Sequence, residues 1–382
     1  MVNLITQAQF SCRTCGSHRL YEVTEFDVLK KITSDCKPVQ TLMTLWECSE
    51  CGLVQKRITA DAKVELDSIY QKYITYKDDI EPTVFTSDAS DTRSTLIVNQ
   101  ISKMVDLNEA GTLVDIGCGD GAFLSEFSHQ KPNWTIYGYD INQNRKDEIE
   151  RICGQGHFLS GPLNDLPEDV DLVSLNYVIE HIDDVEKLLK LVFAKLSHRG
   201  QITALVPDLE KNPYDLVVAD HLSHYSKTSY LMQFQALMEV DQCIHFLEKE
   251  LLVTTRPGSR PKVSPIKYPL SVEGLAKTSI DHLLAVRKIA QRLVGEYESF
   301  GILGTAIAGS WLSCELPGAK IFFIDEDERK QQSRHLERPV LAPSATPLGA
   351  CIFLPFRRKT AENIRQRLSK KTRATMIDPG ID

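Results

Sequence analysis

The spacing of hydrophobic residues along this chain switches several times between that of a helix and that of a strand. In residues 94–255 helix-like and strand-like segments alternate, as they do in an α/β domain. Amphipathic stretches predict helices at 96–107 and 184–197. Apolar runs predict strands at 112–116, 134–140, 156–160 and 200–206, a strand with its exit turn at 170–182, and a final strand or hairpin at 243–255. Strands that alternate with helices pack side by side as a mainly parallel sheet. The pattern therefore predicts such a sheet, covered by helices.

The flanking regions follow other patterns. Before the sheet we expect a strand at 41–46, a helix at 60–76 and a polar linker or flexible lid at 77–93. After it we expect a long helix at 276–299, a glycine-punctuated strand–turn–helix at 300–309, and strands at 320–325 and 350–354. These later elements predict a second, smaller Rossmann-like α/β unit. The basic segment after residue 356 is typical of a solvated helix with a frayed tail.

The turn after residue 116 is the first candidate ligand site. Asp115 ends an apolar run, and Gly117, Gly119 and Gly121 follow at alternate positions before a helical pattern begins. Glycine lets a backbone approach a ligand closely, and the following helix offers free N–H groups. The spacing is shorter than the dinucleotide motif G-x-G-x-x-G. A purely structural turn is the alternative.

Polar residues at the ends of neighbouring strands extend this candidate site. Asp140 ends the next predicted strand, about twenty residues beyond the glycines, where a carboxylate can accept both hydroxyls of a ribose. Asn176, Glu180 and His181 lie at the exit of the 170–182 strand. The carboxyl ends of parallel strands line the ligand crevice, so these side chains should face cofactor and substrate. Turn capping by Asp140 and a structural role for His181 are the alternatives.

A dense titratable cluster follows the strand at 200–206. Asp220 and His221 are adjacent, and His224 and Tyr225 come soon after. A histidine with a pKa near neutrality suits general-base work, and Asp220 is placed to tune His221. A polar surface loop is the alternative.

Composition and charge narrow the classes of protein. The chain has 382 residues, 42% hydrophobic and 25% charged, with a formal net charge of −8. This acidic balance gives no support to binding of nucleic acid or an anionic membrane. We expect no membrane span, no signal peptide, and a cytoplasmic location. Ten cysteines without a secretion signal favour metal binding over disulfides.

Four of the cysteines have the spacing of a metal site. Cys12 and Cys15 form one C-x-x-C-G knuckle, and Cys48 and Cys51 form a second. Two such knuckles complete a tetrahedral zinc site with no open position, so the Zn²⁺ should be structural rather than catalytic. Coincidental redox or free thiols are the alternative. Cys36 is expected to be an ordinary thiol and not a fifth metal ligand.

The motifs around Asp115 and Glu180 resemble those of class I S-adenosylmethionine (SAM) methyltransferases. The three-part order further resembles the sugar C-methyltransferases that act on nucleotide-linked deoxy-ketosugars. Those proteins combine an N-terminal zinc module, a central SAM domain and a C-terminal Rossmann-like domain. The resemblance rests on the four cysteines, residues 115–121, Glu180-His181, Asp220-His221, and residues 301–309 with Asp325.

The resemblance implies a role for each matching residue. Asp115 with the glycines would hold the methionine end of SAM, Asp140 its ribose, and Asn176 would face the cofactor. Asp220-His221 matches the family's Glu-His pair that carries the base, with Asp in place of Glu. Tyr76, or Tyr73, is the nearest match to a tyrosine of the active site. The chain departs from the family pattern at residues 32–38, in the tyrosine spacing and at Pro162, where an acid is usual; Asn164 or Asp165 are candidate substitutes.

The sequence therefore predicts a zinc module with its connecting helix at 1–76, a SAM-dependent methyltransferase domain at 77–265, a Rossmann-like substrate domain at 266–358 and a basic tail at 359–382. We expect transfer of a methyl group from SAM to a sugar or nucleotide-sugar-derived small molecule, on carbon or oxygen, in surface-polysaccharide or secondary-metabolite biosynthesis, by a monomer or homodimer. The catalytic residues would be His221, Asp220, His181 and Tyr76. A zinc-module RNA methyltransferase and a non-catalytic binding protein on the same fold are the alternatives.

Overall fold

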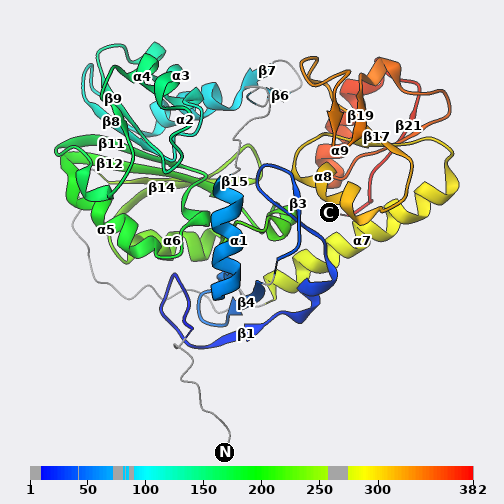
Figure 1. The fold of residues 1–382 in the computed structure, drawn as a ribbon, viewed down its shortest axis with the longest axis horizontal. Helices are drawn as coiled ribbons and strands as arrows, with labels where there is room; N and C mark the ends of the chain where they lie inside the picture. The colour runs from blue at the N-terminus through cyan, green and yellow to red at the C-terminus, as the bar shows by residue number, and fades with distance from the viewer. Residues whose placement is uncertain are drawn as a thin grey trace, which may run out of the picture.

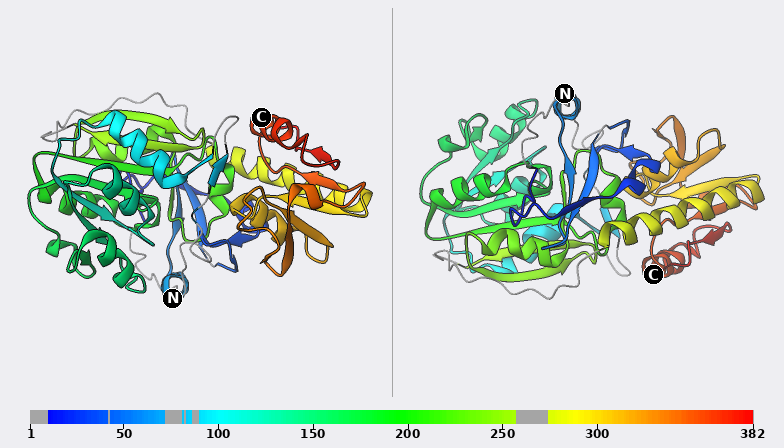
Figure 2. Two further views of the ribbon diagram at one scale, coloured as in Figure 1. Left: turned by 90° about the horizontal axis from the view of Figure 1, so that it is seen from above. Right: turned by 90° about the horizontal axis from the view of Figure 1, so that it is seen from below.

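The computed structural model describes residues 10–41, 43–71, 81, 83–85, 90–256 and 274–381. Three parts follow one another along the chain. The central and C-terminal parts stand side by side, and the N-terminal part lies against both of them (Figure 1). The views from above and below agree that the N-terminal part lies between the other two (Figure 2). No helix among the described residues is both long and apolar enough to cross a membrane.

The central part contains a seven-stranded sheet in the order β10-β9-β8-β11-β12-β15-β14. Five strands are parallel, and β15 and β14 form the antiparallel hairpin at one edge. The strands are β8 Thr112–Ile116, β9 Thr135–Tyr139, β10 Phe158–Leu159, β11 Val170–Asn176, β12 Leu196–Pro207, β14 Val240–Phe246 and β15 Glu250–Thr255. The predicted parallel α/β sheet and its terminal hairpin are confirmed.

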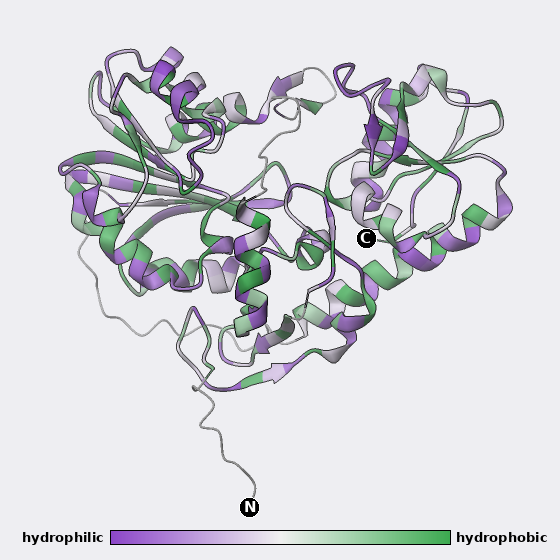
Figure 3. Ribbon diagram, in the orientation of Figure 1, coloured by the Kyte–Doolittle hydropathy of each residue, from purple (hydrophilic) through white to green (hydrophobic). Residues whose placement is uncertain are grey.

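Helices cover both faces of this sheet. They are α2 Arg93–Met104, α3 Ala122–Gln130, α4 Lys146–Cys153, α5 Val185–Lys195 and α6 Lys227–Gln235, with short 3-10 helices η3 Leu163–Asp165, η4 Ile179–His181 and η5 Pro213–Val217. The middle strands β8 and β11 are mostly apolar because both of their faces are buried, as in other parallel sheets. Hydrophobic residues accordingly concentrate along the strands, while the outer helices alternate between hydrophobic and hydrophilic residues (Figure 3).

The N-terminal part is built on a four-stranded antiparallel sheet in the order β1-β4-β5-β13. Its elements are β1 Leu20–Glu22, η1 Thr24–Val28, the pair β2 Lys31–Ile32 and β3 Pro38–Val39, β4 Thr44–Cys48, β5 Val54–Arg57 and α1 Ala60–Gln71. The fourth strand, β13 Ser223–His224, comes from the central part of the chain. The segment that follows β12 is therefore shared between two parts of the molecule.

A small hairpin stands where the sequence predicts a linker or flexible lid. Strands β6 Thr83–Phe85 and β7 Ser90–Thr92 pair antiparallel, and β7 runs directly into α2. Thr92 also caps α2, because its side chain accepts a hydrogen bond from the Thr95 N–H. The described residues of the predicted polar linker or flexible lid thus form a paired hairpin.

The C-terminal part has a six-stranded sheet in the order β18-β19-β17-β16-β20-β21. Its elements are α7 Leu275–Glu296, β16 Phe300–Leu303, α8 Ile307–Glu315, β17 Ile321–Ile324, β18 Arg334–His335, β19 Arg338–Leu341, η6 Pro343–Ala345, β20 Cys351–Phe353, α9 Arg358–Leu368 and β21 Thr375–Ile377. Strand β21 pairs parallel with β20, and α9 buries Ala361, Ile364 and Leu368. A solvated helix with a frayed tail after residue 356 is therefore a wrong expectation, because these residues complete the sheet and its core.

A buried carboxylate joins the N-terminal part to α7. Glu47 on β4 accepts hydrogen bonds from the N–H groups of Gly274, Leu275 and Ala276, at 2.8, 3.0 and 3.1 Å. These N–H groups have no partner within the helix, and the negative charge complements the helix dipole. Glu47 thereby fixes the start of the longest helix against the four-stranded sheet.

Candidate active site

The glycine turn after β8 has the conformation that only glycine adopts easily. Gly117, Gly119 and Gly121 have φ angles of +75°, +54° and +82°. The Gly117 N–H donates to the Tyr139 carbonyl at 2.7 Å, which ties the turn to the end of β9. A Cβ on Gly117 would lie 2.6 Å from Cγ2 of Val178. Glycine is therefore required both by the backbone conformation and by close packing at this turn, which leads into α3 at the carboxyl end of β8.

Two carboxylates flank this turn. The Asp140 carboxylate accepts hydrogen bonds from the Gly119 N–H at 3.0 Å and from the Asn142 N–H at 2.8 Å. Asp115 accepts a hydrogen bond from the Ser174 hydroxyl at 2.6 Å. Burial raises the pKa of both acids, and that of Asp115 reaches about 7. The candidate cofactor residues therefore lie together at the ends of adjacent strands.

Asn176 completes this group at the end of β11. Both atoms of its side-chain amide are buried, and neither makes a hydrogen bond of good geometry to a described residue. The amide lies close enough to Asp115 to act against the rise in the pKa of that carboxyl, and a polar ligand would supply the well-aligned hydrogen bonds that the buried amide lacks. The two acids, the glycine turn and this amide fit a ligand such as SAM, which carries an amino group, a carboxylate and a ribose.

The exit of β11 places Glu180 and His181 on η4. Glu180 is completely buried, neither of its carboxylate oxygens accepts a hydrogen bond from another described residue, and burial raises its pKa to about 8. The Nδ1 atom of His181 lies 2.9 Å from the Asp220 carbonyl and 3.1 Å from the Tyr70 hydroxyl. Burial lowers the pKa of His181 to about 4, so its ring is neutral at physiological pH.

Asp220 contacts different partners from those that the sequence suggests. Its carboxylate accepts hydrogen bonds from the N–H of Ser34 at 2.7 Å and from the Ser34 hydroxyl at 2.5 Å, and it lies 3.5 Å from Nδ1 of His181. Burial favours a higher pKa for Asp220, but His181, His221 and Ser34 outweigh it, and the pKa is lowered. The direct Asp220–His221 pair expected from their adjacency is not formed, because the Asp220 carboxylate is directed toward Ser34 and His181.

His221 is held by Asp215, a residue that the sequence analysis does not single out. The Nδ1 atoms of His221 and His224 each lie 2.6 Å from a different oxygen of the Asp215 carboxylate. All three side chains are buried, and 9% of the His221 side-chain surface is exposed to solvent. The His221 ring packs against His181 with centroids 4.6 Å apart and an interplanar angle of 87°.

The charges around His221 and His224 shift their pKa values in opposite directions. Burial acts to lower the pKa of His221, but the Asp215 carboxylate outweighs it, and the pKa is raised above 6.5. Burial and the nearby Lys56 lower the pKa of His224 to about 4. The Asp215 pKa is itself lowered, since the two histidines outweigh the effect of burial. His221 is thus the histidine of this pair whose charged form is favoured by its surroundings.

Three parts of the molecule meet around these residues. Strand β13, which contains His224, pairs with β5 of the N-terminal sheet. The Lys56 ammonium of β5 donates to the carbonyls of Val218 and His221, the latter at 2.9 Å. Helix η5, which contains Asp215, packs against α7, and Tyr214 beside it contacts Trp311 of α8. The cluster is therefore fixed by contacts that no single part could supply.

Tyr76 and Tyr73 lie outside the described residues, so their role stays a prediction. The tyrosine that does reach the cluster is Tyr70, near the end of α1. Tyr70, Ser34, Asp215 and Lys56 are the site residues that sequence reasoning missed. An acid within the otherwise apolar stretch around Asp215 was the available signal, because a buried carboxylate needs charged or hydrogen-bonding partners.

The four expected metal ligands converge at one point. The Sγ atoms of Cys12 and Cys51 lie 3.4 Å apart, those of Cys15 and Cys48 lie 3.6 Å apart, and all four lie within 4.8 Å of one another. Zinc–sulfur bonds of about 2.3 Å in a tetrahedron put the sulfurs about 3.8 Å apart. The donor set and spacing fit a structural zinc ion. Two other sets of donors approach as closely, Glu180 with His181 and His221, and Asp215 with His221 and His224.

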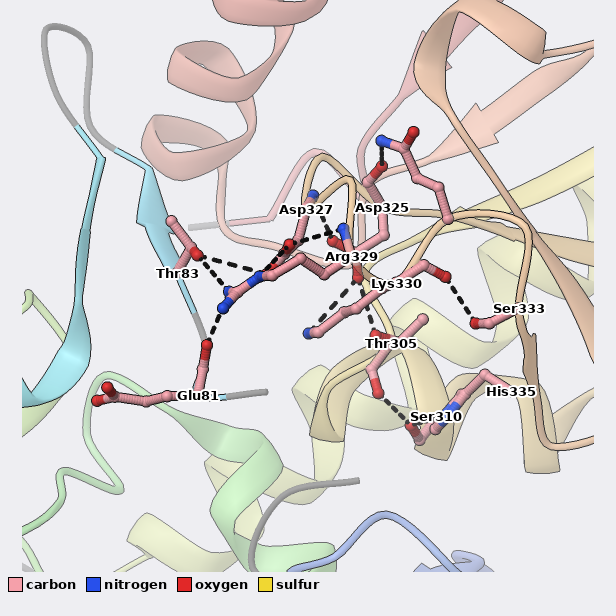
Figure 4. A network of polar contacts seen from close by, with 11 residues as sticks. Glu81, Thr83, Thr305, Ser310, Asp325, Asp327, Arg329, Lys330, Ser333 and His335 are labelled. Atoms are coloured by element: carbon pink, nitrogen blue, oxygen red, sulfur yellow. Dashed lines mark hydrogen bonds and ion pairs between the residues drawn. The ribbon is translucent and has the colours of Figure 1, made fainter. Parts of the chain in front are cut away.

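The second strand–turn–helix has a polar network of its own. After β16, the Thr305 hydroxyl donates to Asp325 at the end of β17 at 2.8 Å, and the Ser310 hydroxyl lies 2.7 Å from Nε2 of His335 (Figure 4). Arg329 extends from the same region to the Glu81 carbonyl and the Thr83 hydroxyl, at 2.9 and 2.7 Å. This network joins the C-terminal part to the β6–β7 hairpin.

Residues 91–249 match the family model described as "Methyltransferase domain". A trans-aconitate 2-methyltransferase from Variovorax paradoxus is 29% identical over 112 residues, which are 28% of this chain and 43% of that protein. A small RNA 2'-O-methyltransferase from Rattus norvegicus is 26% identical over 193 residues, 43% of this chain and 46% of that protein. A ribosomal RNA small subunit methyltransferase C from Serratia proteamaculans is 26% identical over 104 residues, 27% and 29% of the two chains. The chain thus spans less than half the length of these curated relatives.

Among solved structures, a protein from Pyrococcus horikoshii has 16% sequence identity and a TM-score of 0.38, and covers 50% of this chain and 98% of that one. A methyltransferase of calicheamicin biosynthesis, described as bound to SAH, has 16% identity and a TM-score of 0.36, with 43% and 54% of the two chains covered.

Proposed function

We propose, from the premise that residues 91–249 form a class I SAM-dependent methyltransferase domain, that this protein methylates a sugar or nucleotide-linked sugar, on carbon or on oxygen. The observation that carries the proposal is the buried cluster of histidines and carboxylates beyond β11 and β12. Sugar hydroxyls, and the carbon next to a sugar ketone, are weak nucleophiles until a base removes their proton. The cluster supplies such a base.

His221 is the proposed base. The Asp215 carboxylate raises the pKa of His221, and it does so from the Nδ1 side of the ring, where the two groups lie 2.6 Å apart. The neutral His181 and the Tyr70 hydroxyl lie beside it and can orient the acceptor. Tyr76, from the segment that follows α1, is proposed to join them. When His221 takes the proton, the charge that forms on its ring is stabilised by Asp215.

The cofactor end is proposed to be held by the residues around β8 and β9. SAM supplies an electrophilic methyl group, and its transfer is an in-line displacement that depends on alignment. Asp140 would accept the ribose hydroxyls, while Asp115 and the turn at 117–121 would hold the methionine end. Asn176 would meet the polar atoms that its buried amide lacks. These residues lie at the carboxyl ends of β8, β9 and β11, whereas His221 lies in the segment after β12, between η5 and β13.

The flanking parts support a sugar acceptor. We propose that the four cysteines bind a structural zinc ion, which fixes β5 and therefore the position of Lys56 beneath the His221 backbone. The turn between β16 and α8, with Thr305 and Asp325, is proposed to contact the nucleotide or phosphate part of the substrate.

The test is methyl transfer from radiolabelled SAM to a panel that contains a thymidine-diphosphate-linked 4-keto-6-deoxysugar, other nucleotide-linked sugars and an RNA control. We expect labelled sugar, and a loss of about 100-fold or more for His221→Gln with unchanged SAM binding by calorimetry. His129→Gln, at the end of α3 and away from the cluster, is the matched control. Full activity of His221→Gln would remove His221 as the base.

An RNA acceptor is the second candidate, since two of the relatives are named as RNA methyltransferases. The net charge of −8 argues against it, because phosphate backbones are bound through clustered positive charge. Label in the RNA arm of the panel and none in the sugar arms would favour this second function. SAM binding without transfer to any arm would support neither acceptor.

A further inference from the structure

We propose that Asp215 is a positioning residue that makes His221 a base at Nε2, and that His224 serves as the fixed donor that orients the Asp215 carboxylate. The inference rests on the proposed function, in which His221 removes the proton of the acceptor. The carrying observation is one fully buried carboxylate whose two oxygens each lie 2.6 Å from Nδ1 of a different histidine.

The hydrogen-bond inventory fixes which nitrogen of His221 is free. An ionised carboxylate only accepts hydrogen bonds, so each of its two partners must donate. Nδ1 of His221 therefore carries a proton, and in the neutral ring Nε2 is left with a lone pair. A base at Nε2 can take a proton from an acceptor, whereas the other tautomer could not.

The second histidine has a different task. His224 is completely buried, and its Nε2 has no hydrogen-bond partner among the described residues. A charged imidazole would leave a buried N–H⁺ without an acceptor, so His224 remains neutral and donates only through Nδ1. It holds the second Asp215 oxygen in place and adds no competing positive charge. The proton that His221 gains is thus stabilised mainly by the charge of Asp215, with Glu180 and Asp220 acting in the same direction.

Asp215 is also held rigidly by the main chain around it. It lies on η5, between Tyr214, which packs against Trp311, and the segment whose carbonyls receive the Lys56 ammonium. The packed backbone and the two histidine contacts together restrain the Asp215 carboxylate when His221 becomes charged. The titratable and charged groups that face His221 are Asp215, Asp220, Glu180, His181, His224 and Lys56.

The variant Asp215→Asn removes the negative charge and one hydrogen-bond acceptor while it leaves the packing nearly unchanged. Asn has nearly the same shape, but it offers one acceptor and one donor where Asp offers two acceptors. One of the two histidines must then accept at Nδ1 and carry its proton on Nε2. The variant should mix the tautomers of His221 and lower its pKa, because burial remains and the opposing charge is gone.

His224→Asn and the double variant Asp215→Asn/His224→Asn test the role of the second histidine. The amide introduced at position 224 can replace the Nδ1–H donor, so the single variant should keep the properties of His221. In the double variant, the side-chain oxygen introduced at position 224 can accept a hydrogen bond from the side-chain N–H₂ group introduced at position 215. The oxygen of the amide at position 215 is then free to accept from His221, so the Nδ1–H tautomer should return while the pKa stays low.

The experiment is long-range ¹H–¹⁵N NMR of the full chain labelled in histidine, with the His221 signals assigned from their absence in His221→Gln. It reads tautomer and pKa without any acceptor. A second readout is exchange, in D₂O, of the proton next to the ketone of a thymidine-diphosphate-linked 4-keto-6-deoxysugar. We expect a pKa above 6.5 and the Nδ1–H tautomer in the parent, a lower pKa with mixed tautomers in Asp215→Asn, and a loss of about 100-fold in exchange rate.

The outcomes separate this inference from the proposed function. An unchanged His221 pKa and tautomer in Asp215→Asn would overturn the role of Asp215, whatever the sugar assay shows. Failure of the double variant to restore the Nδ1–H tautomer would overturn the role of His224. If the NMR results are as expected but the parent protein does not exchange the proton of the ketosugar, the positioning role is supported and the ketosugar is removed from the proposed function.

Discussion

Replacing Asp115 by asparagine should stabilise the folded protein in a pH-dependent way and weaken its hold on SAM. Asp115 is 3% exposed, and burial raises its pKa from 3.8 to about 7. A carboxyl whose pKa is raised on folding favours the folded state at low pH, and this contribution is lost as the pH rises toward the folded pKa. The introduced amide does not titrate, and its oxygen can still accept from the Ser174 hydroxyl.

The size of the effect follows from the two pKa values. At 1.36 kcal/mol for a pKa difference of one, the advantage of the variant over the parent should grow by about 2–3 kcal/mol between pH 5 and pH 8. Comparing the two pH values cancels any constant effect of the substitution. The cofactor should respond in the other direction: loss of a charge-assisted hydrogen bond, about 1.5–3 kcal/mol, weakens SAM binding by about 10- to 100-fold.

Hydrogen exchange read by mass spectrometry on peptides that contain β8 is the suitable assay, because one unfolding free energy is not well defined for a chain of three parts. Calorimetry at pH 8 measures SAM affinity. Ser174→Ala is the control: it keeps the Asp115 carboxyl and should keep, or steepen, the pH dependence. If parent and Asp115→Asn change equally between pH 5 and pH 8, burial of the charge is not the cause, and unchanged SAM affinity would remove Asp115 from the cofactor site.

Three further predictions concern the supports of the site. Cys48→Ser, or a strong zinc chelator, should remove one zinc ion per chain by elemental analysis and increase hydrogen exchange in β13; zinc loss without that increase would contradict the structural role. Gly117→Ala should lower both Tm and SAM affinity, since the added Cβ would lie 2.6 Å from the Val178 side chain at a φ of +75°. The double variant Gly117→Ala/Val178→Ala should recover part of the lost Tm, and equal Tm values for the single and double variants would refute the clash. Glu47→Gln should lower the free energy of local opening at the start of α7 by about 1–2 kcal/mol and speed hydrogen exchange there, because one accepting oxygen and the charge at the helix N-terminus are lost. Unchanged exchange at the start of α7 would show that the cap is dispensable.

The sequence by itself determined the features that depend on neighbours in the chain. The apolar runs predict β8 and β11 closely because a parallel strand buried on both faces is mostly hydrophobic. The C-x-x-C-G spacing predicts the convergence of Cys12, Cys15, Cys48 and Cys51, since one knuckle already fixes two ligands. The glycine turn is predicted for the same reason, because positive φ angles restrict the residue type locally.

Only the tertiary structure decided the partners within the proposed catalytic cluster. Asp220 is adjacent to His221 in sequence, yet its carboxylate bonds to Ser34, which lies 186 positions away. Asp215 takes its place beside His221 because η5 and the extended segment that follows it return the chain onto itself, and β13 then joins a sheet of the N-terminal part. Periodicity and spacing describe local geometry, whereas the choice among several acids near one histidine depends on how distant segments pack and on which buried charge must be satisfied.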